Sequence, residues 1–192
     1  MAPVPAVDVR AASVVDDGLR AELLACWVDV TNAGGAVGFV PPVSSDDVGP
    51  VLDRLLDGVT SGRDVLCVLT VDGATAGFAA LVGSSSPLRR HWATVLRVQV
   101  HPSLQGHGLG RQLMAGVHRI AVEHGWEFLS LTARGGTGVD GFYRGLGYTE
   151  VGRIPGAVRV AAGDDRDEIL LVHRLPGPGA RGPVPALVDP GA

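Results

Sequence analysis

The stretch from Val100 to Met114 reads VHPSLQGHGLGRQLM, with glycine at three alternate positions, Gly106, Gly108 and Gly110. An apolar run precedes these glycines, and an apolar stripe of helical period follows them as far as residue 121. Glycine is entropically costly in regular structure, so a cluster at a strand-to-helix junction indicates a backbone that approaches a ligand closely or takes φ > 0. We therefore expect a binding site at this junction.

Three kinds of ligand site could use such a segment. A dinucleotide fingerprint needs G-x-G-x-x-G and an acidic residue about twenty positions later, whereas the spacing here is G-x-G-x-G. A nucleotide-binding P-loop ends in Gly-Lys-Ser/Thr, where this chain has Arg111 and Gln112. The third is an anion site, in which unpaired N–H groups at a helix start face a diphosphate. A flexible turn without a ligand is the structural alternative.

Length and composition favour one domain over residues 1–175. In residues 176–192, PGPGARGPVPALVDPGA, 9 of 17 residues are Pro or Gly, which predicts a flexible tail. The formal net charge of −4 argues against a nucleic-acid partner. Cys26 and Cys67 stand far apart, so we expect two core residues and no metal site or disulfide. We find no signal or membrane-spanning pattern, and we expect a soluble cytoplasmic protein without a membrane partner.

The predicted elements alternate in an α+β order. Two helices come early, a hairpin follows around Asp72-Gly73, and the chain then runs strand, helix, strand, short helix and a last strand pair. The ranges predicted as helix are 16–32, 44–61, 109–123 and part of 139–148. Those predicted as strand are 8–13, two runs within 63–83, and 91–101, 126–132, 149–154 and 167–175.

The residues from Val98 to Arg111 resemble a known family motif. VQVHP followed by QGHGLGR is similar to the acetyl-CoA-binding motif of the GCN5-related N-acetyltransferases (GNAT), a strand and then [Q/R]-x-x-G-x-[G/A] before a helix. FYRGLGY, at 142–148, resembles the second signature of the family. VGFVPP at 37–42 and GRIP at 152–155 resemble the subgroup that contains the tabtoxin-resistance acetyltransferase.

This resemblance implies a GNAT fold, αβα, with a mixed, mostly antiparallel, twisted sheet, about four helices and a splay at the cofactor-binding strand. It implies transfer of an acetyl group from acetyl-CoA to a primary amine of a small molecule, and it is compatible with a homodimer. The backbone of Val98 and Val100 would hold the pantetheine arm, and an N–H near Val100 would polarise the thioester. The implied cofactor-binding residues are Val98, Gln99, Val100, Gln105, Gly106, His107, Gly108, Leu109, Gly110 and Arg111.

The resemblance makes Tyr143 the general acid that protonates the leaving thiolate. The general base stays open, because Thr94 and Thr132 stand where the subgroup has carboxylates, which leaves a water chain, His91 or an already deprotonated substrate. The cofactor-binding Asn of the family is also missing before the last helix. Arg97 and Asp140 could contact the acceptor or lie on the surface.

Two alternative functions follow from these departures. An acyl-CoA-binding sensor or regulatory module of the same fold would not need the missing carboxylates. A protein that binds ATP or NAD through the glycine segment is disfavoured by its spacing and by the absent lysine. The two early helices and the loop between them should form the wall of the acceptor site, because such segments vary on a fixed scaffold. The sequence does not identify the acceptor.

Overall fold

A computed structural model describes residues 5–176. Its seven strands form one sheet in the order β1-β2-β3-β4-β5-β7-β6. All neighbouring strands are antiparallel except β4 and β5, which are parallel. The strands are β1 (Val7–Ala11), β2 (Asp64–Val71), β3 (Ala74–Gly83), β4 (Trp92–Val100), β5 (Phe128–Arg134), β6 (Thr149–Ala161) and β7 (Asp164–Arg174). This is the mixed, mostly antiparallel sheet that the sequence predicts.

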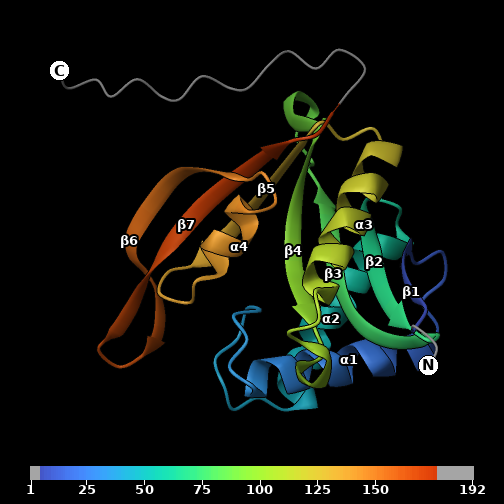
Figure 1. The fold of residues 1–192 in the computed structure, drawn as a ribbon, viewed down its shortest axis with the longest axis horizontal. Coiled ribbons are helices and arrows are strands. Elements are labelled where there is room, and N and C mark those ends of the chain that lie inside the picture. Colours follow the sequence, from blue (N-terminus) through green and yellow to red (C-terminus); the bar gives the residue numbers. More distant parts are fainter. Residues whose placement is uncertain (1–4, 177–192) are drawn as a thin grey trace.

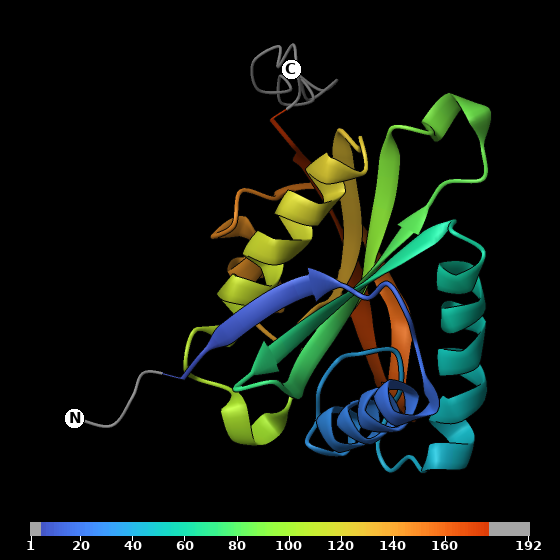
Figure 2. The ribbon, with the colours of Figure 1, turned by 90° about the vertical axis from the view of Figure 1, so that its right-hand side faces the viewer.

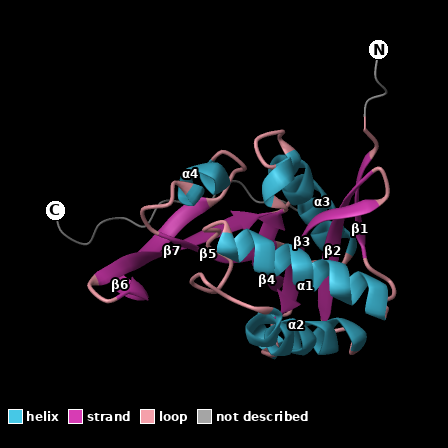
Figure 3. Ribbon diagram, turned by 90° about the horizontal axis from the view of Figure 1, so that it is seen from below, coloured by secondary structure: helices cyan, strands magenta, loops and turns pink. Residues whose placement is uncertain are grey.

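Four α-helices cover the two faces of the sheet (Figures 1 and 2). One face carries α1 (Asp17–Asn32) and α2 (Ser45–Thr60), whose apolar sides pack with Leu66, Val68 and Phe78 of the sheet. The other carries α3 (Leu109–Glu123) and α4 (Val139–Arg144), which share a second core cluster with the sheet. Figure 3 shows α1 and α2 on one side of the molecule and α3 and α4 on the opposite side. The layers are therefore helix, sheet and helix.

The sheet opens between β4 and β5. These strands pair only through Trp92, Ala93 and Thr94, opposite Phe128, Leu129 and Ser130. Beyond Thr94 they diverge, so that β1–β4 and β5–β7 spread apart from a common end (Figure 1). From Val95 onward, the edge of β4 that faces β5 therefore has no strand partner among residues 5–176, and the predicted splay is confirmed.

The last strand pair is longer than the sequence predicts. The ranges 149–154 and 167–175 were expected as strands, but β6 reaches Ala161 and β7 begins at Asp164. Pro155 and Gly156 favoured a break after Ile154. In the structure, the β6–β7 ladder is interrupted between Ile154 and Val158 and then continues to Ala161. Pro155 and Gly156 lie in this irregular segment, so they do not end the strand.

The remaining boundaries agree with the predicted elements to within a few residues. Cys26 and Cys67 are both buried free thiols, as expected. Between residues 5 and 176 we find no helix that has both the length and the apolar character needed to cross a lipid bilayer. The predicted tail, 176–192, lies outside the described residues apart from Pro176.

Candidate active site

The glycine segment begins α3 at the mouth of the splay. Gly108 is the N-cap of α3, with a left-handed backbone of φ 78°, and Gly106 also has a positive φ of 82°. In the described part of the chain, none of the five consecutive N–H groups of residues 106–110 donates to a backbone carbonyl. The first turn therefore presents a row of free donors at the positive end of a 15-residue helix, which is the physical requirement for binding a phosphate.

The open edge of β4 presents further backbone groups. His101 N–H points toward β3, where it donates to Ala76 O at 2.8 Å. Because backbone groups alternate along an extended strand, Val100 N–H faces the opposite side, toward the splay. On that side the Val100 carbonyl accepts a hydrogen bond from Gln105 Nε2 at 2.9 Å. Gln105 thus fixes the turn that connects β4 to the glycine segment.

A bulge distorts β4 just before this edge. Two residues of β4, Arg97 and Val98, lie opposite the single residue Ala79 of β3, and Arg97 takes a positive φ of 56°. A bulge of this kind bends the strand and leaves backbone groups unpaired. The predicted pantetheine-binding strand therefore turns away from β5 at the position where the splay widens.

These features line one cavity of about 500 Å³, which we call the glycine cleft. Its walls include nine of the ten predicted cofactor-binding residues, and His107 is the exception, with an exposed side chain directed elsewhere. The other lining residues come from the end of α1, the loop after it and α4. The residues are Val30, Gly35, Ala36, Val37, Val98, Gln99, Val100, Gln105, Gly106, Gly108, Leu109, Gly110, Arg111, Val139, Phe142 and Tyr143.

Gln99 carries a buried polar group at the wall of the glycine cleft. Its side chain is only 3% exposed, and neither Oε1 nor Nε2 has a hydrogen-bond partner in the described part of the chain. A buried amide without partners is costly, so such a group calls for an explanation. In the strand register Gln99 lies opposite Phe78 of β3, which packs with α1 and α2, so the amide points to that face of the sheet and not along the open edge of β4.

Tyr143 stands where the glycine cleft meets a second cavity. It lies on α4, is 7% exposed, and packs edge-to-face against Phe142 and Tyr148. Burial raises the pKa of Tyr143 to about 12, so the phenol keeps its proton throughout the neutral range. The hydroxyl of Tyr148, in contrast, lies 3.2 Å from His118 Nε2, away from both cavities.

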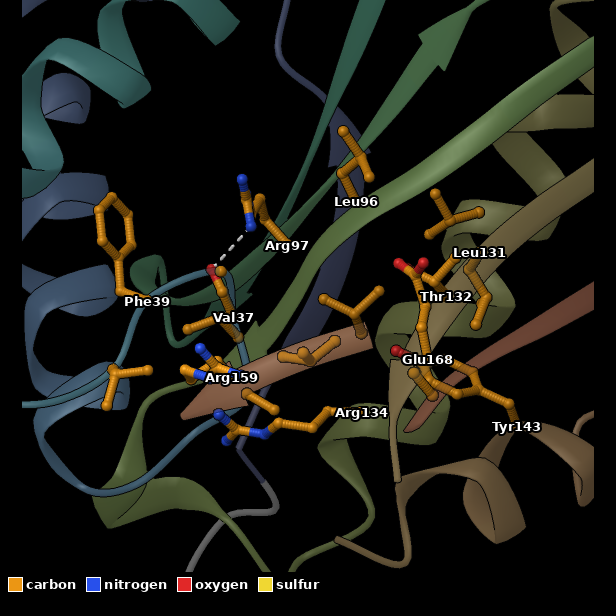
Figure 4. A pocket seen from close by; sticks show the side chains of 17 residues that line it. Val37, Phe39, Leu96, Arg97, Leu131, Thr132, Arg134, Tyr143, Arg159 and Glu168 are labelled. Carbon is orange, nitrogen blue, oxygen red and sulfur yellow. Dashed lines mark hydrogen bonds between the residues drawn. The ribbon is translucent and has the colours of Figure 1, made fainter. Parts of the chain in front are cut away.

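The second cavity, which we call the arginine cavity, encloses about 370 Å³ (Figure 4). It lies between β4, β5, the β6–β7 ribbon and the loop after α1. Val37, Val98 and Tyr143 line both cavities, so the two spaces meet at Tyr143. The charged residues of the arginine cavity are Arg97, Arg134, Arg159 and Glu168.

The loop between α1 and α2 closes both cavities from one side. Trp27 Nε1 and Arg97 Nη1 each donate to the Val37 carbonyl at 3.0 Å. The Arg97 guanidinium also lies over the Trp27 ring, 5.0 Å from its centroid, and Phe39 packs on the edge of the same ring. Arg97 therefore holds this loop in place, which is the contact that the sequence could not assign.

Other candidates from the sequence lie away from the two cavities. His91 accepts a hydrogen bond from Trp92 Nε1 at 2.9 Å within an aromatic group and lines neither cavity. Asp140 forms an ion pair with Arg144 at 3.0 Å. Thr94 Oγ1 is 3.3 Å from Ser130 Oγ, whereas Thr132 does line the arginine cavity. Between residues 5 and 176 no cluster of three or more His, Cys, Asp or Glu could hold a metal ion.

Glu168 is the residue that the sequence analysis missed. It lies on β7 opposite Arg134 of β5 in the strand register, and it is the carboxylate of the arginine cavity. Along β7 the side chain of Glu168 points to the face opposite to that of Ile169 and Leu171, both of which are buried. This alternation was the only signal in the sequence for the face on which Glu168 lies. Nothing in the sequence related that face to Tyr143, which is 25 positions earlier in the chain.

Residues 62–150 match the family model of the acetyltransferase (GNAT) domain, a range that includes β4, the glycine segment and Tyr143. This range, just under half of the chain, is similar to the GNAT acetyltransferase superfamily. The enzyme class of the chain is therefore acetyltransferase, as the sequence predicts. The matched range ends before β7 and so does not include Glu168.

Solved structures have the same fold as this acetyltransferase. The Salmonella typhimurium structure that contains its cofactor acetyl-CoA is 20% identical, with a TM-score of 0.71 over 91% of this chain and 96% of that one. The Brucella melitensis ribosomal-protein-alanine N-acetyltransferase is 20% identical, with a TM-score of 0.70 over 87% and 99%. A GNAT-family acetyltransferase of Streptococcus pneumoniae is 17% identical, with a TM-score of 0.71 over 88% and 100%. At these identities the likeness shows the fold.

Proposed function

We propose that this acetyltransferase transfers the acetyl group of acetyl-CoA to the primary amine of a small molecule, with Tyr143 as the general acid. The observation that carries the proposal is the position of Tyr143 between two connected cavities of different character. The glycine cleft has the free N–H groups and the strand edge that a coenzyme needs. The arginine cavity, on the other side of Tyr143, then receives the acceptor.

The donor side rests on this chain's own groups. The N–H groups of residues 106–110 would bind the pyrophosphate, with Arg111 at the same wall of the cleft. The open edge of β4 would bind the pantetheine arm as an added strand. Val100 N–H, which faces the splay, is placed to polarise the thioester carbonyl. The resemblance to a bound acetyl-CoA structure supports this assignment.

The transfer forms an N–C bond and breaks the C–S bond. The free amine attacks the thioester carbon, and the proton that nitrogen then loses passes to the Tyr143 oxygen as the hydroxyl proton moves to the departing sulfur. A phenol whose pKa is about 12 is a far weaker acid than a thiol, whose pKa is about 8.5, so a lasting tyrosinate is disfavoured. Tyr143 therefore works as a relay between nitrogen and sulfur, without a stable charged state.

The experiment measures free thiol and N-acetylated product from acetyl-CoA with a panel of primary amines. We expect amine-dependent thiol release with one acetylated product per thiol. Thermal shift with acetyl-CoA, ATP and NAD runs beside it, because a bound ligand raises apparent stability. If acetyl-CoA stabilises the protein and no amine accelerates thiol release, the acyl-CoA-binding module is the better account. If ATP or NAD stabilises it and acetyl-CoA does not, the donor assignment is wrong.

The narrower relationship to the tabtoxin-resistance subgroup stays a prediction. It rests on the strings at 37–42 and 152–155, and the first of these is the loop that closes both cavities. We also propose a homodimer and a single domain that ends at residue 175. Sedimentation of the full chain would test the dimer, and sedimentation of a chain ending at residue 176 would test the domain boundary.

A further inference from the structure

The arginine cavity is lined by side chains of opposite charge that do not form an ion pair with each other. Arg134 and Glu168 face each other across the β5–β7 ladder, and both line the cavity. Yet neither forms an ion pair within 4.0 Å among the described residues. Both side chains are partly buried, so each charge loses solvation without gaining a partner.

The other charges around the cavity are already in use. Arg159 makes a two-bond ion pair with Asp165 at 2.6 and 2.7 Å, and Arg97 is bound to the Val37 carbonyl. Arg166 donates hydrogen bonds to the Asp164 carboxylate, which lowers the pKa of Asp164, and the charge of Arg134 lowers it further. Arg134 and Glu168 are therefore the two free charges of this cavity in the described part of the chain.

Figure 4 shows how these side chains are distributed. In this view Arg134 and Arg159 are on one side of the cavity, and Glu168 and Tyr143 are on the other. An ammonium group bound by Glu168 would thus be held on the side of the cavity that Tyr143 lines. Once it has given one proton to solvent, the neutral amine can attack the thioester, and the proton that nitrogen loses after the attack is the one that Tyr143 relays. An acidic group on the same molecule would reach the guanidinium of Arg134, whose fork of donors fits a carboxylate or phosphonate.

We infer that the acceptor is a primary amine that also carries an acidic group, bound with its amine at Glu168 and its acid at Arg134. The inference deepens the proposed function and rests on it. A cavity of about 370 Å³ is at the small end of ligand sites, which fits a short amino acid. Val37, Phe39 and Leu131 supply the apolar wall along the carbon chain.

The test compares ω-amino acids of two to six carbons with their primary amides. Each pair keeps nearly the same amine and differs in the charge of the far end. We expect the wild-type protein to favour the best acid over its amide by about 10–100-fold in kcat/KM, as for loss of one charge-assisted hydrogen bond. If the amides react as well as the acids, the inference is overturned, while acetyl transfer itself stands.

Two variants separate the ends of the acceptor. Arg134→Gln should raise KM for the acid and leave the amide unchanged, so that the acid-to-amide ratio falls toward one. Glu168→Gln should raise KM for the acid and the amide alike, because both carry the ammonium. Acetyl-CoA affinity should hold in both variants, which a folding defect would not allow.

The matched controls are Arg10→Gln on β1 and Glu127→Gln before β5, two exposed side chains away from both cavities. Both should keep the wild-type ratio. If Arg134→Gln keeps that ratio as well, the acid does not bind at Arg134. If no acid and no amide releases thiol although acetyl-CoA binds, the proposed function fails and this inference with it.

Discussion

Tyr143 and Tyr148 differ in what their hydroxyls can do. Both rings are buried and packed edge-to-face, so both contribute apolar contact to the same core. The Tyr148 hydroxyl is used by His118, whereas Tyr143 lines the junction of the two cavities. Replacing each tyrosine by phenylalanine therefore separates a catalytic effect of the hydroxyl from an effect on packing.

Tyr143→Phe should lower the turnover number by about 10²-fold, because the relay between nitrogen and sulfur is lost while the ring remains. Acetyl-CoA affinity, measured by calorimetry, should hold. The control is Tyr148→Phe, which removes a hydroxyl from the same cluster and should leave turnover near the wild-type value. Unchanged turnover in Tyr143→Phe would assign the protonation of sulfur to water.

The contact of α3 with β1 depends on a residue without a side chain. A Cβ atom at Gly116 would lie 2.3 Å from Val9 Cγ1 and 2.5 Å from Val9 Cβ. Such distances require the helix or the strand to move. Because α3 also carries the glycine segment at its N-terminus, this contact helps to place the anion site relative to the sheet.

Gly116→Ala should lower the free energy of unfolding by about 1–3 kcal/mol, since overpacking outweighs the gain in helix propensity. Urea denaturation measures the change. Val9→Ala in the same chain should restore part of the loss, although Val9→Ala alone should destabilise. If the two losses simply add in the double variant, the two positions do not collide and the packing argument is wrong.

α3 is also joined to β7 by a histidine pair. The rings of His118 and His173 stack with centroids 4.6 Å apart, and His173 Nδ1 lies 2.9 Å from the Gly147 carbonyl. Burial, helped by the charge of His173, lowers the pKa of His118 to about 4. His118 is therefore neutral in the folded protein well below the pH at which it protonates in the unfolded chain.

This shift predicts a loss of stability in mild acid. Above about pH 6.5, His118 is mostly neutral in both the folded and the unfolded state. Between pH 6.5 and 4, His118 becomes protonated in the unfolded chain but stays largely neutral in the folded protein. The free energy of unfolding should fall over that window, by up to about 3 kcal/mol. His118→Gln should flatten this part of the curve from urea denaturation, and His107→Gln, at an exposed position, should not. An equal slope in the His118 variant would reject the assignment.

At the scale of the whole molecule, local patterns predicted most of the fold. The apolar stripes of α2 and α3, the Asp72-Gly73 turn and the glycine segment each have a short-range cause, and the structure has them in place. The length of the β6–β7 ribbon was missed because pairing across the irregularity at Pro155 outweighed the local preference for a break.

The residues of the proposed donor half could be named from the sequence, whereas those of the proposed acceptor half could not. The donor half is contiguous, since one strand, one turn and one helix start supply it. The acceptor half joins Val37, Arg134, Tyr143 and Glu168 from four separate segments, and only tertiary structure brings these together. The role of Arg97 could not be predicted from the sequence for the same reason, because its side chain holds a loop that lies 60 positions earlier in the chain.

We propose that acetyl-CoA binds across the splay, with its pyrophosphate at the start of α3. Calorimetry with acetyl-CoA on Gly108→Val tests this directly, with Gly125→Val as the matched control at the other end of the same helix. Both glycines have φ near +77° and open space at Cβ, so both variants carry the same backbone strain. The account predicts that Gly108→Val loses binding and that Gly125→Val keeps it. Wild-type affinity in a folded Gly108→Val protein would contradict it.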